Sequence, residues 1–279
     1  MSDLERKKTI AYIVIFSFLV TLLAWISPLL GGSPSSPGLG FIIWGTAPLL
    51  VSVLMRIVTR DWSDVGIKPA ISNNVRWYII SILAYPIIMA FTLLTGAIIS
   101  VSSVSGFSLT LYLKTVLPAF GIFFIFALFE EFGWRGYLVP KLASIGMNDY
   151  LIHAIVAVVW ASWHLPFIRE LSWLYTSEDL RTFIPRLYLG AFAFSIVYDE
   201  IRIITRTFWP AVLMHCVSNS FGHPLAAEYV TIATGKEYLA SIGFDGVFMI
   251  AFFGLLGIAL NRWRVRRVRL SRSFTANRL

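Results

Sequence analysis

Two carboxyl groups and a guanidinium group lie close together inside a long apolar stretch of the sequence. Glu130, Glu131 and Arg135 follow the apolar residues 117–129 and precede residues 137–139, which are Tyr-Leu-Val. On a helix, Glu131 and Arg135 share one face and can pair, whereas Glu130 points about 100° away from Glu131. Because a water-poor environment favours protonation of a carboxylate, Glu130 is suited to act as a general base near neutral pH. The alternative is a structural ion-pair cluster that joins two helices.

Three further polar side chains lie in later apolar stretches. If a turn near residues 143–149 joins two antiparallel helices, Glu130 is about 16 residues before its centre and His164 about 18 after it, which places both at similar depth. His215 and Asn219 are one helical turn apart and project from one face. The alternative for the last two is hydrogen bonding that only joins helices.

Together these groups indicate a hydrolytic site. A carboxylate and an imidazole can activate water, and a His–Asn pair can donate hydrogen bonds to a developing oxyanion, an effect often worth about 3–4 kcal/mol. The cluster therefore predicts hydrolysis of an acyl bond, and a peptide bond fits best.

The composition indicates that membrane-spanning helices must position these residues. Of the 279 residues, 57% are hydrophobic and 14% are charged. A soluble domain carries about 25% charged residues and could not hide so much apolar surface. We therefore expect an all-α polytopic membrane helix bundle that forms a single domain over residues 1–279. A disordered chain, a disulfide scaffold and a nucleic-acid-binding module are excluded.

A helix needs about 20 apolar residues to cross the hydrocarbon core of a bilayer. The sequence predicts eight such spans, with the motifs between about residues 113 and 224. The predicted spans are 9–30, 40–58, 76–100, 113–142, 150–168, 183–203, 207–224 and 240–261.

Basic residues predict the orientation. The loop at 56–76 is basic, whereas the loops at 31–39 and 100–112 carry no charge. By the positive-inside rule, both termini are cytoplasmic and the protein is a multi-pass protein of the cell membrane. The 169–186 loop holds three arginines and three acidic residues, so its charge does not indicate on which side of the membrane it lies. The tail at 262–279 is rich in arginine and is expected to contact anionic lipids, not nucleic acid.

These motifs resemble those of the CAAX protease and bacteriocin-processing (CPBP) group of intramembrane endopeptidases, which includes the Ras-converting CAAX endopeptidases. The group has the motifs Glu-Glu-x-x-x-Arg, Phe-x-x-x-His and His-x-x-x-Asn, in that order. The corresponding residues are Glu130, Glu131 and Arg135, then Trp160 and His164, then His215 and Asn219. Trp160 stands where Phe is usual, and the Trp-His-Leu-Pro string at 163–166 is similar to the prokaryotic branch.

The resemblance implies about eight transmembrane helices around a membrane-embedded catalytic cavity. It implies that Glu130 and His164 activate the attacking water, and that His215 and Asn219 form the oxyanion site. The implied substrate is a membrane-anchored or prenylated protein, or a leader or bacteriocin precursor. A monomer or weak oligomer is expected.

The other motif residues have supporting roles under the same resemblance. Glu131 and Arg135 shape the site, and Trp160 preserves an aromatic wall. A zinc-dependent version of the hydrolysis would use Glu130, His164 and His215 as ligands. The favoured interpretation has no cofactor, because a His-Glu-x-x-His motif is absent.

Other intramembrane proteases fit the sequence less well. Asp199 follows a tyrosine, but the Gly-x-Gly-Asp motif of presenilin-type proteases is missing. Ser162 and Ser218 lack the glycine-rich setting of a rhomboid nucleophile. Cys216 is adjacent to His215 and therefore points about 100° away from it on a helix, so it is expected to be a packing residue.

Two functions from other classes remain as alternatives. One is a non-catalytic immunity or regulatory membrane protein. The other is a small transporter, for which the sequence shows no inverted repeat. His153 and His223 belong to no motif and are expected to be interfacial or structural.

Overall fold

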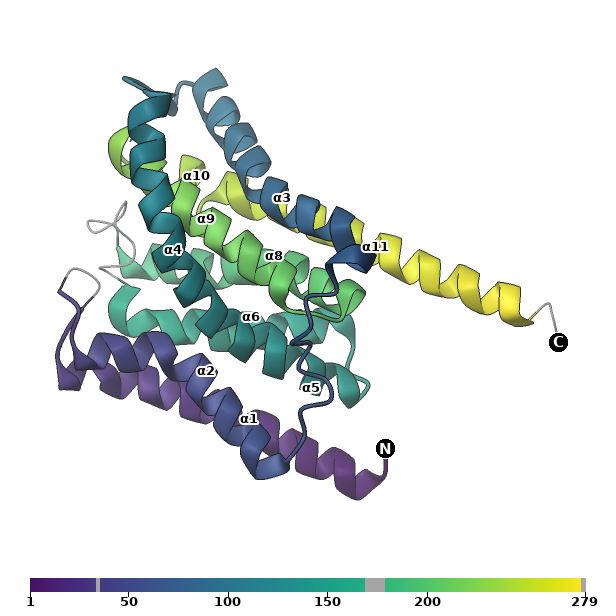
Figure 1. Ribbon diagram of the computed structural model, residues 1–279. Coiled ribbons are helices and arrows are strands. Elements are labelled where there is room, and N and C mark those ends of the chain that lie inside the picture. Colours follow the sequence, from purple (N-terminus) through teal and green to yellow (C-terminus); the bar gives the residue numbers. More distant parts are fainter. Residues whose placement is uncertain (34–35, 169–178, 277–279) are drawn as a thin grey trace.

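The computed structural model describes residues 1–33, 36–168 and 179–276, with side chains to residue 270. Over these residues the chain is almost entirely helical, so the predicted all-α polytopic bundle is confirmed (Figure 1). The long helices are α1 (Asp3–Ile26), α2 (Leu39–Thr59), α3 (Ile71–Ile98), α4 (Leu109–Gly133), α6 (Asp149–His164), α8 (Leu180–Thr205), α9 (Trp209–Glu228) and α11 (Val247–Ala276). The shorter helical segments are η1 (Ser27–Leu30), η2 (Trp134–Leu138), α5 (Val139–Ser144), η3 (Leu165–Phe167) and α10 (Glu237–Ala240).

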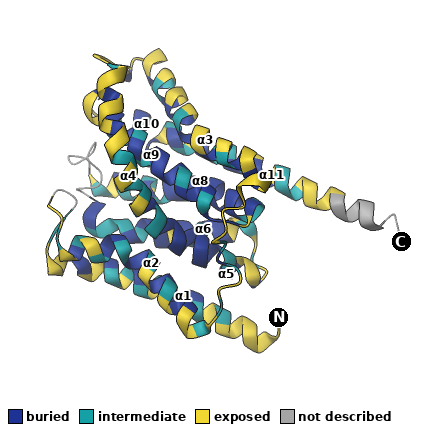
Figure 2. Cartoon of the chain, in the orientation of Figure 1, coloured by how far each residue is buried: buried dark blue, intermediate teal, exposed yellow. Residues whose placement is uncertain are grey.

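Each predicted span corresponds to a helix, but the spans are not all equivalent. In the described part of the chain, six helical segments are long and apolar enough to cross a membrane, and α8 and α9 are not among them. These two helices carry many polar side chains and are largely buried. Figure 2 shows the exposed residues concentrated on the outer helices α1, α3, α4 and α11. The polar groups of α8 and α9 are therefore shielded by surrounding helices.

The last span differs from its predicted bounds of 240–261. The helix α11 begins at Val247, because a turn with glycine at positions 243 and 246 separates it from α10. A Cβ atom on Gly190 of α8 would lie 1.6 Å from the carbonyl oxygen of Phe244, so only glycine lets this turn approach the bundle so closely. Beyond Asn261, α11 continues as a helix that projects from the bundle (Figure 1).

Both ends of the chain lie at the same end of the bundle (Figure 1). At the opposite end, the short strands β1 (Ser102–Val104) and β2 (Val230–Ile232) pair antiparallel, with Ser102 opposite Ile232. This two-stranded sheet ties the loop after α3 to the loop after α9, and the sequence did not predict it. The part of the 169–186 loop at residues 169–178 lies outside the described residues.

Candidate active site

The Glu-Glu-x-x-x-Arg motif lies where α4 changes into the π-helical turn η2. The predicted ion pair is present: Arg135 Nη1 lies 3.1 Å from both carboxylate oxygens of Glu131, and both side chains are fully buried. A π-helical turn of this kind is rare and often marks a functional site.

Two arginines from other helices satisfy carbonyl groups of this turn. Arg202 of α8 donates from Nε to the carbonyl of Arg135 at 2.6 Å, and Arg56 of α2 donates to the carbonyl of Gly136. Arg56 also pairs with Asp64 at 2.9 Å. These contacts fix the turn that carries Arg135, because a buried carbonyl without a donor is costly.

The α2–α3 loop is held against the same region by Lys141 of α5. The Lys141 ammonium contacts Asp61 and Asp64 at 2.5 and 2.9 Å. Its hydrogen bond, helped by that of Ser63, lowers the pKa of Asp61 well below its usual range.

Arg135 has a second carboxylate partner that sequence reasoning missed. Its Nε donates to Asp199 of α8 at 2.9 Å, and Asp199 also contacts Nδ1 of His153 at 2.9 Å. Asp199 and His153 are both fully buried, although the sequence placed them near span ends. Neither belongs to a motif, and only their charge inside an apolar stretch could have indicated them.

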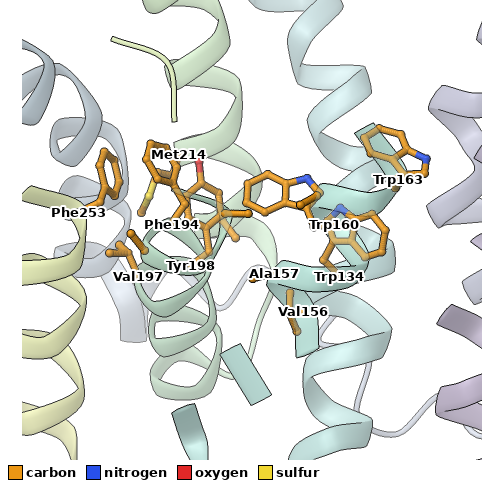
Figure 3. Close-up of a cluster of buried hydrophobic side chains, with 14 of the residues drawn as sticks. Trp134, Val156, Ala157, Trp160, Trp163, Phe194, Val197, Tyr198, Met214 and Phe253 are labelled. Carbon is orange, nitrogen blue, oxygen red and sulfur yellow. The ribbon is translucent and has the colours of Figure 1, made fainter. Parts of the chain in front are cut away.

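Trp160 of α6 lies at the centre of the cluster. Its indole Nε1 donates a hydrogen bond to Glu130 Oε2 at 2.9 Å, which a phenylalanine at this position could not do. Its ring centroid is 5.8 Å from that of His164 and 5.9 Å from that of His215. In Figure 3, Trp160 lies between Trp134 and Trp163 on one side and Tyr198 on the other. Trp160 therefore does more than preserve an aromatic wall.

His164 is positioned by the irregular end of α6. Its Nδ1 donates to the carbonyl of Trp160 at 2.9 Å, which leaves Nε2 with a free lone pair in the neutral ring. Glu130 and His215 are both near enough to interact with His164 electrostatically.

Tryptophans satisfy the carbonyls next to His164. Because Pro166 has no N–H, the carbonyl of Ser162 lacks its helical donor, and Trp25 of α1 donates to it instead at 3.3 Å. Trp44 of α2 and Trp163 stack 4.0 Å apart, and each indole donates to the carbonyl of the other residue. The depth of His164 is thus fixed by contacts with α1 and α2.

His215 of α9 lies between the two adjacent glutamates. Its Nδ1 is 2.9 Å from Glu131 Oε1, and its Nε2 is 3.7 Å from Glu130 Oε1. Since an ionised carboxylate only accepts hydrogen bonds, Nδ1 must carry a proton. Two neighbouring carboxylates favour the doubly protonated ring, whose Nε2–H can also donate.

Asn219 lies one turn beyond His215 and is partly exposed. Its Oδ1 accepts a long hydrogen bond from Ser218 Oγ at 3.5 Å, and within the described residues its Nδ2 has no hydrogen-bond partner. One turn further, His223 lines an open groove of about 570 Å³ between α4 and α9, together with Phe123 and Thr115. This groove extends along the same helix that carries His215 and Asn219.

Phe244 packs against Trp160 and His164. Its ring is parallel to that of Trp160 at 6.0 Å and lies 5.6 Å from the ring of His164. Tyr85 of α3 donates to the carbonyl of Ile242 in the same turn at 2.8 Å. Nothing in the sequence connected this turn with the motifs.

The predicted zinc ligands do not form a ligand set. Among the described residues, no three His, Cys, Asp or Glu side chains are arranged to hold a metal ion.

Residues 112–221 match the family model of the Rce1-like type II CAAX prenyl endopeptidases. Over this segment the chain is similar to a family of intramembrane proteases. The matched segment contains all three motifs, and the match agrees with the resemblance to the CPBP group. Helices α1 to α3 and α11 lie outside the matched residues. No curated protein matches the chain.

The hydrogen bond from Trp160 to Glu130 can be tested with Trp160→Phe. This variant keeps an aromatic ring but removes one donor to a charged group, worth about 1.5–3 kcal/mol. We expect peptide cleavage to slow by about tenfold or more. Trp209→Phe is the matched control, since Trp209 donates only to the carbonyl of Ile67 at the other end of α9. Equal rates for Trp160→Phe and the wild-type protein would contradict this role.

Proposed function

We propose that this protein is an intramembrane endopeptidase that hydrolyses a peptide bond of a membrane-associated or lipidated substrate. The observation that carries the proposal is the convergence of Glu130, His164 and His215 from three helices around Trp160. The match to the Rce1-like family model supports peptide hydrolysis.

In this proposal, Glu130 and His164 activate the attacking water. The lone pair on His164 Nε2 orients one water hydrogen, and the Glu130 carboxylate accepts the proton as the oxygen attacks the carbonyl carbon. The indole N–H of Trp160 holds one carboxylate oxygen and leaves the other to the water. The proton then passes from Glu130 to the leaving amine, so atoms and charge balance.

The oxyanion is stabilised by His215 and Asn219. Glu131 holds the proton on His215 Nδ1, which keeps the ring oriented with its Nε2–H toward the site. The Nδ2 group of Asn219 provides a second donor, one turn along α9. Donors that are already oriented stabilise a developing oxyanion without a reorganisation cost.

The substrate reaches the site from the membrane. The groove between α4 and α9 is lined by His223, which is one turn along α9 from Asn219, and it suits an extended peptide near a lipid anchor. We propose a CAAX-type protein or a leader or bacteriocin precursor as the substrate. The protein lies in the cell membrane with both termini cytoplasmic, and the exposed arginines 262, 266, 267 and 269 contact anionic headgroups. Arg264 is excluded from this lipid-facing set because it points into the bundle and pairs with Glu200.

The reaction is expected to need no metal. After exhaustive chelation, the purified protein should cleave a farnesylated CAAX peptide in vesicles at an unchanged rate, because its own carboxylate and imidazole activate the water. Metal content of the same sample, measured by mass spectrometry, is the control. Stoichiometric zinc whose removal stops turnover would establish the zinc-dependent alternative.

Replacement of the water-activating pair tests the proposed function. Glu130→Ala and His164→Ala should each reduce cleavage of the farnesylated peptide at least about a hundredfold, the contribution of a general base. Glu237→Ala, which changes a half-buried glutamate of α10, should cleave at the wild-type rate.

All variants should elute as folded protein in detergent. Full cleavage by folded Glu130→Ala and His164→Ala would reject the catalytic assignment. Comparative mass spectrometry of membrane peptides from cells that contain wild-type protein or Glu130→Ala would then identify the natural substrate.

A further inference from the structure

A network of buried charges extends from the proposed site to α11. Glu131 contacts His215 and Arg135, and Arg135 contacts Asp199. Asp199 and Glu200 are neighbours on α8, and His153 of α6 lies between their carboxylates. The network therefore extends from α9 through α4 to α8 and α6.

This network of charges ends on α11. Arg264 donates to both oxygens of Glu200, at 2.6 Å from Nε and 2.9 Å from Nη2. Asn261 donates to the same carboxylate at 2.7 Å. Arg264 also contacts Asp149 at the start of α6 at 2.7 Å. Helix α11 thus makes three hydrogen bonds to Glu200.

His153 lies between two carboxylates of this network. Its Nδ1 makes a hydrogen bond of 2.9 Å with Asp199, and its Nε2 lies within ion-pair distance of Glu200, at 3.4 Å. The three fully buried carboxylates are those of Glu131, Asp199 and Glu200. The basic groups that contact these carboxylates are those of Arg135, Arg264, His153 and His215. Because each carboxylate is shared between two of the basic groups, loss of one member leaves its neighbours free to move.

We propose that Arg264, acting through Glu200, His153 and Asp199, is a positioning residue for the Glu131–His215 pair. Each residue in the network orients the next, and the contact between Glu131 and His215 sets the direction of the His215 ring. This inference rests on the proposed function and assigns a catalytic contribution to α11, which lies outside the matched family domain.

The substitution Arg264→Gln tests the coupling from far outside the site. With the farnesylated CAAX peptide in vesicles of zwitterionic phosphatidylcholine, in which Arg267 has no anionic headgroup to bind, kcat should fall about fivefold to thirtyfold, while KM changes less than about twofold. Substrate contacts remain, but the His215 ring is less well oriented. Arg267→Gln is the matched control, because Arg267 is one turn further on the same helix and exposed. It should keep the wild-type kcat.

A spectroscopic readout does not depend on the substrate. In protein labelled with ¹⁵N-histidine, the ring resonances of His215 should move in Arg264→Gln and stay unchanged in Arg267→Gln. If Arg264→Gln does not give folded protein, Asn261→Ala replaces it with the same expectations, because it removes one α11 contact to Glu200 without removing a charge.

Folded Arg264→Gln with wild-type kcat and unmoved His215 resonances would overturn the coupling, whatever Glu130→Ala does. The proposed function fails separately, if Glu130→Ala cleaves as fast as the wild-type protein. An inactive Glu130→Ala beside a fully active Arg264→Gln would therefore reject only the role of α11.

Discussion

The structure depends on keeping one guanidinium group charged inside a membrane bundle. Arg135 is fully buried, and it is stable there because Glu131 and Asp199 both face it at hydrogen-bond distance. Removing one partner of a buried ion pair typically costs about 3–5 kcal/mol, since the other charge is left without compensation. The helices that supply these partners, α4 and α8, are therefore locked to each other at one depth. This depth also fixes Glu130, the neighbour of Glu131, and through Glu131 it fixes His215 of α9.

Irregular backbone next to the site helps to fix the positions of the site residues. The π-helical turn after Gly133 and the proline after Leu165 both leave carbonyl groups without their usual donors. Side chains from distant helices satisfy them, with Arg56 and Arg202 at the turn and tryptophans near His164. Each such contact ties backbone at or near a motif residue to a helix that carries no motif. The outer helices α1 and α2 thus contribute to the site without supplying a reacting group.

Much of this arrangement could be predicted from the sequence, because intramembrane charges are costly and helical spacing is regular. The Glu131–Arg135 pair followed from those two facts. The roles of Asp199 and His153 did not, because they depend on which faces of α6 and α8 meet, and a single sequence does not give helix rotation. The turn that places Phe244 on Trp160 was missed for a similar reason. Its approach depends on the absence of a side chain at Gly190.

The most direct test of this account is the cleavage rate of Glu131→Gln, Arg135→Gln and the double variant, with all three shown to be folded. If the two residues act as one unit that orients His215, each single substitution should slow kcat about as much as both together, as expected for strongly coupled residues. Losses that simply multiply in the double variant, or single variants that cleave at the wild-type rate, would contradict the account.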